Sequence, residues 1–186
     1  MKRKKVIYLT LLVVFIFLFF IIGKYNGMVE QREKVYSAKS QIENLLERRI
    51  ELIPNLVASV KGYTKHEEKI LSEISDARAK MSGASSLNEK LNENDNLGSA
   101  ISRLLVVIEN YPNLKANEQF TGLRDELAGT ENRLSTARRD YNESVKKYNQ
   151  KIFSFPNNIF ARVFKFEKFE YFKAKDGAQN VPIVDF

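Results

Sequence analysis

The chain contains no cysteine and only one histidine, and each shortage excludes a kind of chemistry. Without cysteine there is no disulfide, no thiolate nucleophile and no cysteine-ligated zinc. His66 has no second histidine with which to share a metal ion, and the stretch HEEKI lacks the last residue of the zinc-protease motif H-E-x-x-H. Metal and thiol enzymes of these kinds are therefore excluded.

Other catalytic patterns are also missing from the sequence. No nucleophile is found with a base, and the stretches GTENR and LGSA lack the lysine and the spacing of a phosphate-binding loop. The neighbouring carboxylates of Glu67 and Glu68 point in different directions on a helix, which suits solvent exposure better than shared proton chemistry. We therefore expect no catalytic residue, no metal site and no cofactor.

The formal net charge of +7 is concentrated at the N-terminus. Residues 1–24 carry five basic side chains and no acidic one, whereas residues 25–186 carry 25 basic and 23 acidic side chains. In the second part the charges alternate at helix-surface spacing, which is typical of a solvated face and not of a phosphate-binding stripe. We expect no nucleic-acid partner.

The basic start MKRKK is followed by an uncharged apolar run, residues 6–22. As a helix this run rises about 26 Å, which crosses a hydrocarbon core of about 30 Å once the flanking side chains reach the interface. The alternative is a cleaved signal peptide, but the run ends in FLFFIIGKYNG and has no A-x-A-like cleavage site. We expect an uncleaved anchor over residues 1–24, with the lipid bilayer as its partner.

The basic residues on either side of the anchor predict its orientation. Four basic side chains and the amino terminus lie within the first five residues, and those after the anchor are spread along the chain. The positive-inside rule then predicts a cytoplasmic N-terminus and an extracytoplasmic body in a single-pass membrane protein. The bias is modest because Lys24, Arg32, Lys34 and Lys39 follow the anchor.

Apolar residues recur at steps of three and four along the body, as they do on one face of a helix. The serine- and asparagine-rich stretch SGASSLNEKLNENDNLGS interrupts this pattern and is typical of a loop, with room for a short helical turn. The predicted elements are a helix over residues 29–81, a loop over residues 82–96, a helix over residues 97–110, a long helix from Asn113 as N-cap to Phe155, and a short helix over residues 159–164.

Helices that each carry one apolar stripe must bury those stripes against one another. We therefore expect an all-α fold in which a transmembrane helix is followed by an antiparallel, coiled-coil-like bundle of long helices. The domains would be the anchor, residues 1–24, and the bundle with an aromatic tail, residues 25–186. The short C-terminal helix or a partner chain would supply a fourth element.

Pro54 lies inside the first long predicted helix. It has no N–H, and its ring collides with the carbonyl group of Ile50, a defect of about 3 kcal/mol in a helix interior. A new helix starting at Pro54 would need Ile53 as its N-cap, and isoleucine has no side-chain acceptor. The apolar stripe continues beyond Pro54 with a shift of about one residue, so we expect the helix to bend there.

Polar residues fall on the apolar stripes at Arg49 and Thr130. The interpretation we favour is structural: Arg49 pairs with a glutamate of a facing helix and fixes the register of the bundle. The alternative is a polar pocket beside the bend, formed by Arg48, Arg49, Glu131 and Arg138, that binds an anion or a partner's carboxylate.

The end of the chain is rich in aromatic residues, as in FKFEKFEYFKA. One interpretation is that they form a docking patch for protein or lipid. The other is that phenylalanines fold back and close the end of the bundle. The candidate docking patch consists of Phe166, Phe169, Tyr171 and Phe172, and the residues that would fold back are Phe155, Phe160, Phe164 and Phe166.

Several long stretches of the chain resemble the LemA family of bacterial membrane proteins. The resemblance runs in order from about residue 25 to residue 186 and makes Pro54 part of a LIPNLV signature. It implies an N-terminal membrane helix followed by a helical bundle in the bacterial envelope, and it supplies no catalytic residues. The stretches are RRIELIPNLVASVKGYTKHE, NYPNLKANEQFTGLRDELAGTENRLSTARRDYNESVKKYN, SFPNN, YFKA and VPIVDF.

These observations favour a membrane-anchored, non-enzymatic helical scaffold or adaptor of the bacterial cell envelope that contacts an envelope or membrane protein. The alternative is a self-associating protein that organises or senses membranes as a homo-oligomer. An enzyme has the least support, because the residues that such chemistry requires are missing.

Overall fold

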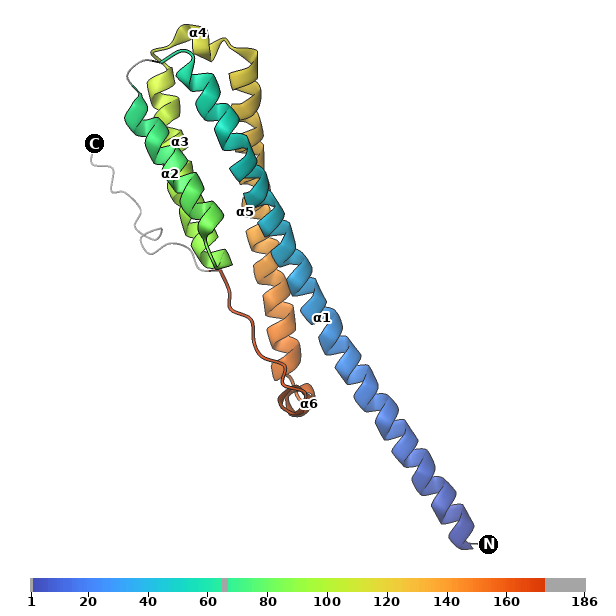
Figure 1. The fold of residues 1–186 in the computed structure, drawn as a ribbon. Helices are drawn as coiled ribbons and strands as arrows, with labels where there is room; N and C mark the ends of the chain where they lie inside the picture. The colour runs from blue at the N-terminus through green and yellow to red at the C-terminus, as the bar shows by residue number, and fades with distance from the viewer. Residues whose placement is uncertain (1, 65–66, 173–186) are drawn as a thin grey trace, which may run out of the picture. The chain divides into compact units, whose positions relative to one another are not determined.

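The computed structural model describes residues 2–64 and 67–172, and all the secondary structure in these ranges is helical (Figure 1). This confirms the expected all-α class. His66 and the C-terminal VPIVDF lie outside the described residues. The helices are α1 (Lys2–Lys61), α2 (Glu68–Gly83), α3 (Leu87–Ile108), α4 (Pro112–Lys115), α5 (Glu118–Phe153) and α6 (Asn157–Val163).

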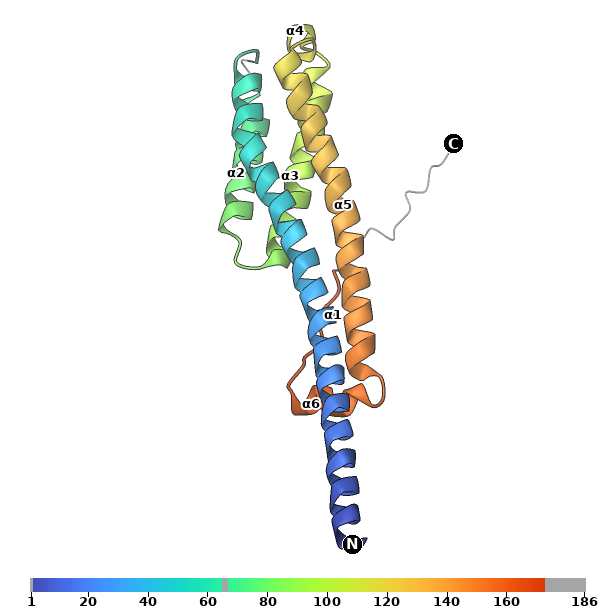
Figure 2. The ribbon, with the colours of Figure 1, turned by 90° about the vertical axis from the view of Figure 1, so that its right-hand side faces the viewer.

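The chain forms two compact units, and α1 and α5 contribute to both. The terminal unit comprises Met1–Ala38 and Asp140–Phe186, and the central unit comprises Lys39–Arg139. In the central unit α2 packs along α3 (Figures 1 and 2). Side-chain hydrogen bonds join α2 to the part of α1 in this unit, and α3 to the corresponding part of α5. Its core is therefore a helical bundle.

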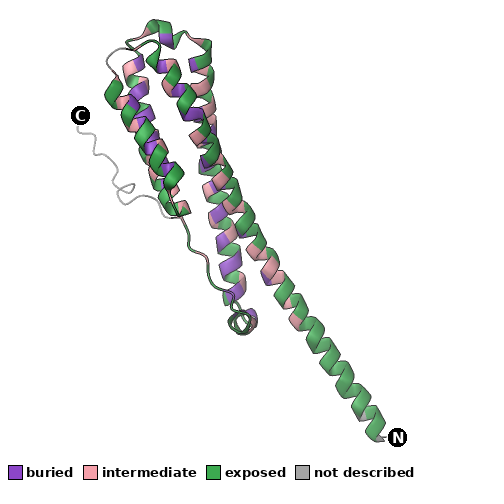
Figure 3. Ribbon diagram, in the orientation of Figure 1, coloured by how far each residue is buried: buried purple, intermediate pink, exposed green. Residues whose placement is uncertain are grey.

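The first part of α1 is apolar and exposed. Its large apolar side chains from Ile7 to Phe20 are all exposed, and full burial begins only at Met28 (Figure 3). Among the described residues, α1 is the one helix long and apolar enough to cross a membrane. This helix could anchor the chain in a bilayer, where its exposed side chains would face lipid.

The apolar repeat predicted from Phe120 to Phe155 is buried along α5, except at Leu123, which is partly buried, and at Phe155. The spacing of three and four residues places these side chains on one face of the helix. Phe155, predicted to continue the stripe, is 80% exposed because α5 ends at Phe153. The buried residues of α5 are Phe120, Leu127, Thr130, Leu134, Ala137, Tyr141, Val145, Tyr148, Asn149 and Ile152.

The loop predicted over residues 82–96 is wrong, because α3 begins inside it. The Oγ of Ser86 caps α3 by accepting from the backbone N–H of Glu89 at 3.2 Å. The Glu89 carboxylate in turn accepts from the backbone N–H of Ser85 at 3.0 Å. This pair of hydrogen bonds is a variant of the capping box and stabilises the start of α3. The apolar residues in the first half of α3 are few and lie among asparagines, so the sequence pattern does not indicate a helix.

The helix predicted over residues 29–81 is two helices, α1 and α2. The first ends at Lys61, next to Gly62, whose backbone freedom disfavours a helix interior. The amide N–H groups of Tyr63 and Thr64 both donate to the carbonyl of Val60, at 2.9 and 3.1 Å, which closes the last turn. The helix therefore ends just before Gly62, although the apolar pattern continues past this glycine.

The start of the long C-terminal helix is also corrected. The N-cap of α5 is Asn117, whose Oδ1 accepts from the backbone N–H of Phe120 at 2.9 Å. Asn113, the predicted N-cap, lies within the short α4. Proline at the first position of α4 favours a separate turn there.

The helix α1 continues through Pro54, so the proline neither ends nor starts a helix. Proline leaves the carbonyl oxygen of Ile50 without its helical donor. The Nε of Arg78, which projects from α2, donates to this oxygen at 3.0 Å. A charge-assisted hydrogen bond from the neighbouring helix thus replaces the missing one.

A double-mutant cycle tests this replacement. Arg78→Met is expected to lower the free energy of unfolding by about 1–2 kcal/mol, because it leaves the Ile50 carbonyl unsatisfied. In a Pro54→Ala background the same change should cost under about 0.5 kcal/mol, since the backbone N–H of the introduced alanine then donates to that carbonyl. Unfolding of the full chain in detergent micelles by denaturant gives both values.

The matched control for this cycle is Lys80→Met, at an exposed site of the same helix. It should change stability little in either background. An equal loss from Arg78→Met with and without Pro54 would show that Arg78 does not compensate for the proline.

Candidate functional site

Arg49 is a buried charged residue of the central unit. Its side chain is 3% exposed, and its Nη1 donates to the Oε2 of Glu131, which projects from α5. Burial lowers the pKa of Arg49 below its ordinary value, and the Glu131 carboxylate opposes that shift. The structure thus places Arg49 and Glu131 in one ion pair across two helices.

The other two residues of the predicted polar seam make different contacts. Arg48 is exposed, with its nitrogens 3.7 Å from a carboxylate oxygen of Glu51 and 3.6 Å from one of Glu126. Arg138 is partly buried, and its Nη2 donates to the Oδ1 of Asp95 on α3 at 3.0 Å. The four seam residues are therefore not joined in a single network of contacts.

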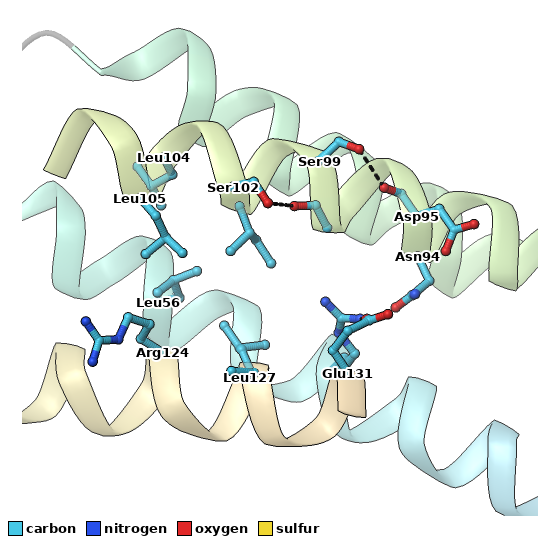
Figure 4. A pocket seen from close by; sticks show the side chains of 14 residues that line it. Leu56, Asn94, Asp95, Ser99, Ser102, Leu104, Leu105, Arg124, Leu127 and Glu131 are labelled. Carbon is cyan, nitrogen blue, oxygen red and sulfur yellow. Dashed lines mark hydrogen bonds and ion pairs between the residues drawn. The ribbon is translucent and has the colours of Figure 1, made fainter. Parts of the chain in front are cut away.

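A pocket of about 440 Å³ opens in the central unit beside the Arg49–Glu131 pair (Figure 4). Leucine and isoleucine side chains form its wall, and polar groups from three helices reach into it. Arg48 and Arg138 do not line it. The lining residues are Arg49 and Leu56 of α1; Asn94, Asp95, Gly98, Ser99, Ile101, Ser102, Leu104 and Leu105 of α3; and Arg124, Leu127, Ala128 and Glu131 of α5.

Asn94 is the unusual member of this lining. It is 1% exposed, yet neither its Oδ1 nor its Nδ2 has a hydrogen-bond partner among the described residues. Figure 4 shows its side chain pointing from α3 toward Glu131. An unsatisfied buried polar group costs about 1–3 kcal/mol, which sets the Asn94 amide apart from the other lining residues.

The sequence contained a signal for Asn94 that composition obscured. Asn94 lies three residues after Leu91 and three before Leu97, both of which are buried. It is therefore a polar residue on the apolar stripe of a helix, in the same way as Arg49 and Thr130. The composition of residues 82–96 indicates a loop, and a loop has no helical stripe on which Asn94 would stand out.

The terminal unit contains a second recognition arrangement, made by residues 166–172, which we term the C-terminal strap. The Nδ2 of Asn149 donates to the carbonyl of Phe169 at 2.9 Å, and the N–H of Phe169 donates to the Oδ1 of Asn149 at 3.1 Å. Asn142 makes the same two bonds with Phe172, at 3.1 and 2.9 Å. Each asparagine amide thus binds both main-chain groups of one strap residue.

Tyrosines preceding these asparagines extend the arrangement. The hydroxyl of Tyr148 donates to the carbonyl of Glu167 at 2.8 Å, and that of Tyr141 to the carbonyl of Glu170 at 3.3 Å. Burial raises the pKa of both tyrosines, which keeps them in the protonated form that donates. The two Tyr-Asn pairs are seven residues apart on α5, a helical rise of about 10.5 Å. The strap residues bound by the two asparagines are three residues apart, which in an extended chain spans about 10 Å, so the spacing on the helix matches the spacing on the strap.

Most of the candidate docking patch is covered in this structure. Phe166 is buried, with its ring 5.6 Å from that of Tyr25 and 5.2 Å from the guanidinium of Arg32. Phe169 and Phe172 are partly buried, and Tyr171 is exposed. Of the four phenylalanines that would fold back in the alternative interpretation, Phe166 is buried and Phe160 is partly buried, whereas Phe155 and Phe164 are exposed. Two rings of the strap pack against tyrosines. The ring of Phe169 contacts those of Tyr36 and Tyr148, and the ring of Phe172 contacts that of Tyr141.

The polar groups of both arrangements are amides, hydroxyls and ion pairs. Within residues 2–64 and 67–172, no group of three or more histidine or carboxylate side chains could hold a metal ion. These groups suit the binding of chain segments through hydrogen bonds.

The fold defines a helical-bundle protein with an N-terminal apolar helix that could span a membrane. Residues 38–186 match the sequence profile of the LemA family, and the chain belongs to this family. The resemblance found in the sequence is thereby confirmed.

Two groups of bacterial relatives are similar over most of the chain. Magnetosome protein MamQ 2 of Paramagnetospirillum magneticum is 27% identical over 202 residues, which cover 95% of this chain and 74% of that protein. Protein LemA of Metamycoplasma hominis is 26% identical over 170 residues, covering 89% of this chain and 76% of that protein. Magnetosome protein MamQ of Magnetospirillum gryphiswaldense is 26% identical over 187 residues, covering 87% of this chain and 68% of that protein.

Proposed function

We propose that the protein is a membrane-anchored, non-enzymatic helical scaffold of the bacterial cell envelope. Residues 6–22 would cross the bilayer, the N-terminus would be cytoplasmic, and the body, residues 25–186, would lie outside the cytoplasm. The exposed apolar start of α1 and membership of the LemA family support this proposal.

The body of this scaffold would be an antiparallel, coiled-coil-like bundle with α1 bent at Pro54. The proline ring disfavours a straight helix, and Arg78 satisfies the carbonyl that a bend would expose. The bend would lie between Arg49 and Leu56, which both line the pocket.

The observation that carries the proposal is the unpartnered Asn94 amide in the pocket of the central unit. The same protein binds main-chain groups with the amides of Asn142 and Asn149. An extended segment of an envelope or membrane protein would bind to Asn94 in the same way, with an aliphatic side chain against the leucine wall. The Arg49–Glu131 pair beside Asn94 is charge-balanced, so a neutral peptide group fits better than a free anion.

Site-specific photocrosslinking in native membranes tests this function. A photoreactive amino acid at Ser102, which lines the pocket, is expected to capture one foreign envelope protein. The same change at Ser72, an exposed serine of α2 outside the pocket, provides the matched control and should capture little. Asn94→Leu should abolish the Ser102 crosslink while far-UV circular dichroism stays unchanged. A crosslink that persists in Asn94→Leu, or is equal at both serines, would refute the pocket as the partner site.

The C-terminal strap supports an alternative function, a self-associating protein that organises membranes. The strap is bound largely through its main chain, so the strap of a second copy would satisfy the same asparagines. Exchange of straps between neighbouring chains would link them into homo-oligomers. Crosslinking that yields a ladder of homo-oligomers, in place of one foreign partner, would support this alternative.

A further inference from the structure

Residues 151–165, which we term the α6 segment, combine exposed apolar side chains with positive charge. The segment carries three basic residues and no acidic one. Its apolar side chains are unusually exposed for a folded unit, and those of Ile159 and Val163 lie one turn apart on α6. The exposed apolar residues are Phe153, Phe155, Ile159, Val163 and Phe164.

Ring contacts with α1 fix the level of the α6 segment along the anchor. The ring of Phe160 lies 6.2 Å from that of Phe20, and the ring of Phe164 lies 5.0 Å from that of Tyr25. Phe20 lies two residues, or about 3 Å, inside the end of the apolar run at Ile22. The α6 segment is therefore at the level where the lipid-facing part of α1 would end and the aqueous part begin.

We propose that the α6 segment inserts into the interfacial layer of the membrane beside the anchor and prefers anionic lipid. A short helix with apolar side chains on one surface and basic side chains at its edge suits the boundary between headgroups and acyl chains. Arg162 and Lys165 are exposed and would meet lipid phosphates, while Ile159 and Val163 would face the acyl chains. This inference rests on the proposed anchoring of residues 6–22.

A hollow beside the segment enlarges the surface available to lipid. It has a volume of about 540 Å³ and is lined mainly by apolar side chains, among them Ile152, Ile159 and Phe166. Soluble domains are close-packed, and a hollow beside exposed phenylalanines is unusual in them. Insertion would fill it with acyl chain and remove the neighbouring apolar surface from water.

Depth-dependent fluorescence quenching tests the insertion on the full chain. Because the chain has no cysteine, one introduced cysteine carries the probe at a single site. The sites are Ile159 in the α6 segment, Val13 in the anchor, and Glu33, an exposed residue of α1 about 16 Å beyond the end of the apolar run. The vesicles contain phosphatidylcholine and phosphatidylglycerol, with nitroxide groups at shallow or deep positions of the lipid.

We expect the Ile159 probe to be quenched most by shallow nitroxides, the Val13 probe most by deep ones, and the Glu33 probe weakly by either. An Ile159 probe quenched no more than the Glu33 probe, with Val13 still quenched, would overturn the insertion and leave the anchor intact. An unquenched Val13 probe would overturn the anchoring and the insertion that rests on it.

Lipid charge provides a second, independent readout. Each basic side chain near an anionic surface contributes roughly fivefold to the binding constant, so Arg162→Gln with Lys165→Gln should reduce the equilibrium constant for insertion into anionic vesicles by roughly 25-fold. The control pair, Lys146→Gln with Lys147→Gln, removes two exposed charges from α5 outside the segment and should change quenching little. If both pairs of substitutions changed quenching equally, the proposed contact of Arg162 and Lys165 with lipid phosphates would be contradicted.

Discussion

Replacement of Asn142 and Asn149 by alanine together is expected to release the C-terminal strap from α5. The change removes four hydrogen bonds to the main chain of Phe169 and Phe172. Each of these hydrogen bonds contributes about 0.5–1 kcal/mol, so the free energy of strap binding should weaken by about 2–4 kcal/mol. Hydrogen exchange at the amides of Phe169 and Phe172 should accelerate roughly 30- to 1,000-fold, because these N–H groups lose their acceptors.

The control is Asn132→Ala, which changes an exposed asparagine of the same helix. It should leave exchange at both phenylalanines unchanged. Unaltered protection in the Asn142 and Asn149 double variant would show that ring packing alone fixes the strap. The alternative function by strap exchange would then lose its basis in main-chain recognition.

Glu131→Gln is expected to destabilise the central unit more than Arg49→Met does. The glutamine variant leaves a guanidinium that is 3% exposed without its carboxylate. Unpairing a fully buried charge costs about 3–5 kcal/mol, and we expect about 2–3 kcal/mol here because the Glu131 side chain is 46% exposed and water reaches the site. The methionine variant removes the buried charge and keeps much of the volume, so its stability should lie within about 1 kcal/mol of the unchanged chain.

Denaturant unfolding of the full chain in micelles measures both effects. Glu126→Gln is the control, since Glu126 is a member of surface ion pairs on the same helix and should cost under about 1 kcal/mol. A larger loss from Arg49→Met than from Glu131→Gln would mean that the pair contributes net stability through its charge. In that case Arg49 would be a structural residue of the bundle, as the sequence interpretation favoured.

Periodicity predicted the long helices well because an apolar stripe must be continuous to be buried. In α5 the repeat from Phe120 to Ile152 follows the buried face. In α1 the pattern continues past Pro54, and so does the helix. The break after Lys61 was missed, since one glycine and a local closing turn interrupt the helix without interrupting the pattern.

The polar contacts were harder to predict, because each depends on two segments that are distant in sequence. The partner of the Ile50 carbonyl, Arg78, follows 28 residues later. The seven-residue repeat of Tyr-Asn at residues 141–142 and 148–149 is visible in the sequence, but its meaning depends on the strap lying against α5. Asn94 was hidden in a stretch whose composition indicated a loop.

The mass of the chain recovered from native membranes tests the central claim most directly. After an alkaline wash that removes peripheral proteins, we expect the whole chain in the membrane pellet, with a mass that includes residues 1–24. A shortened chain in the supernatant, lacking those residues, would contradict a membrane-anchored scaffold.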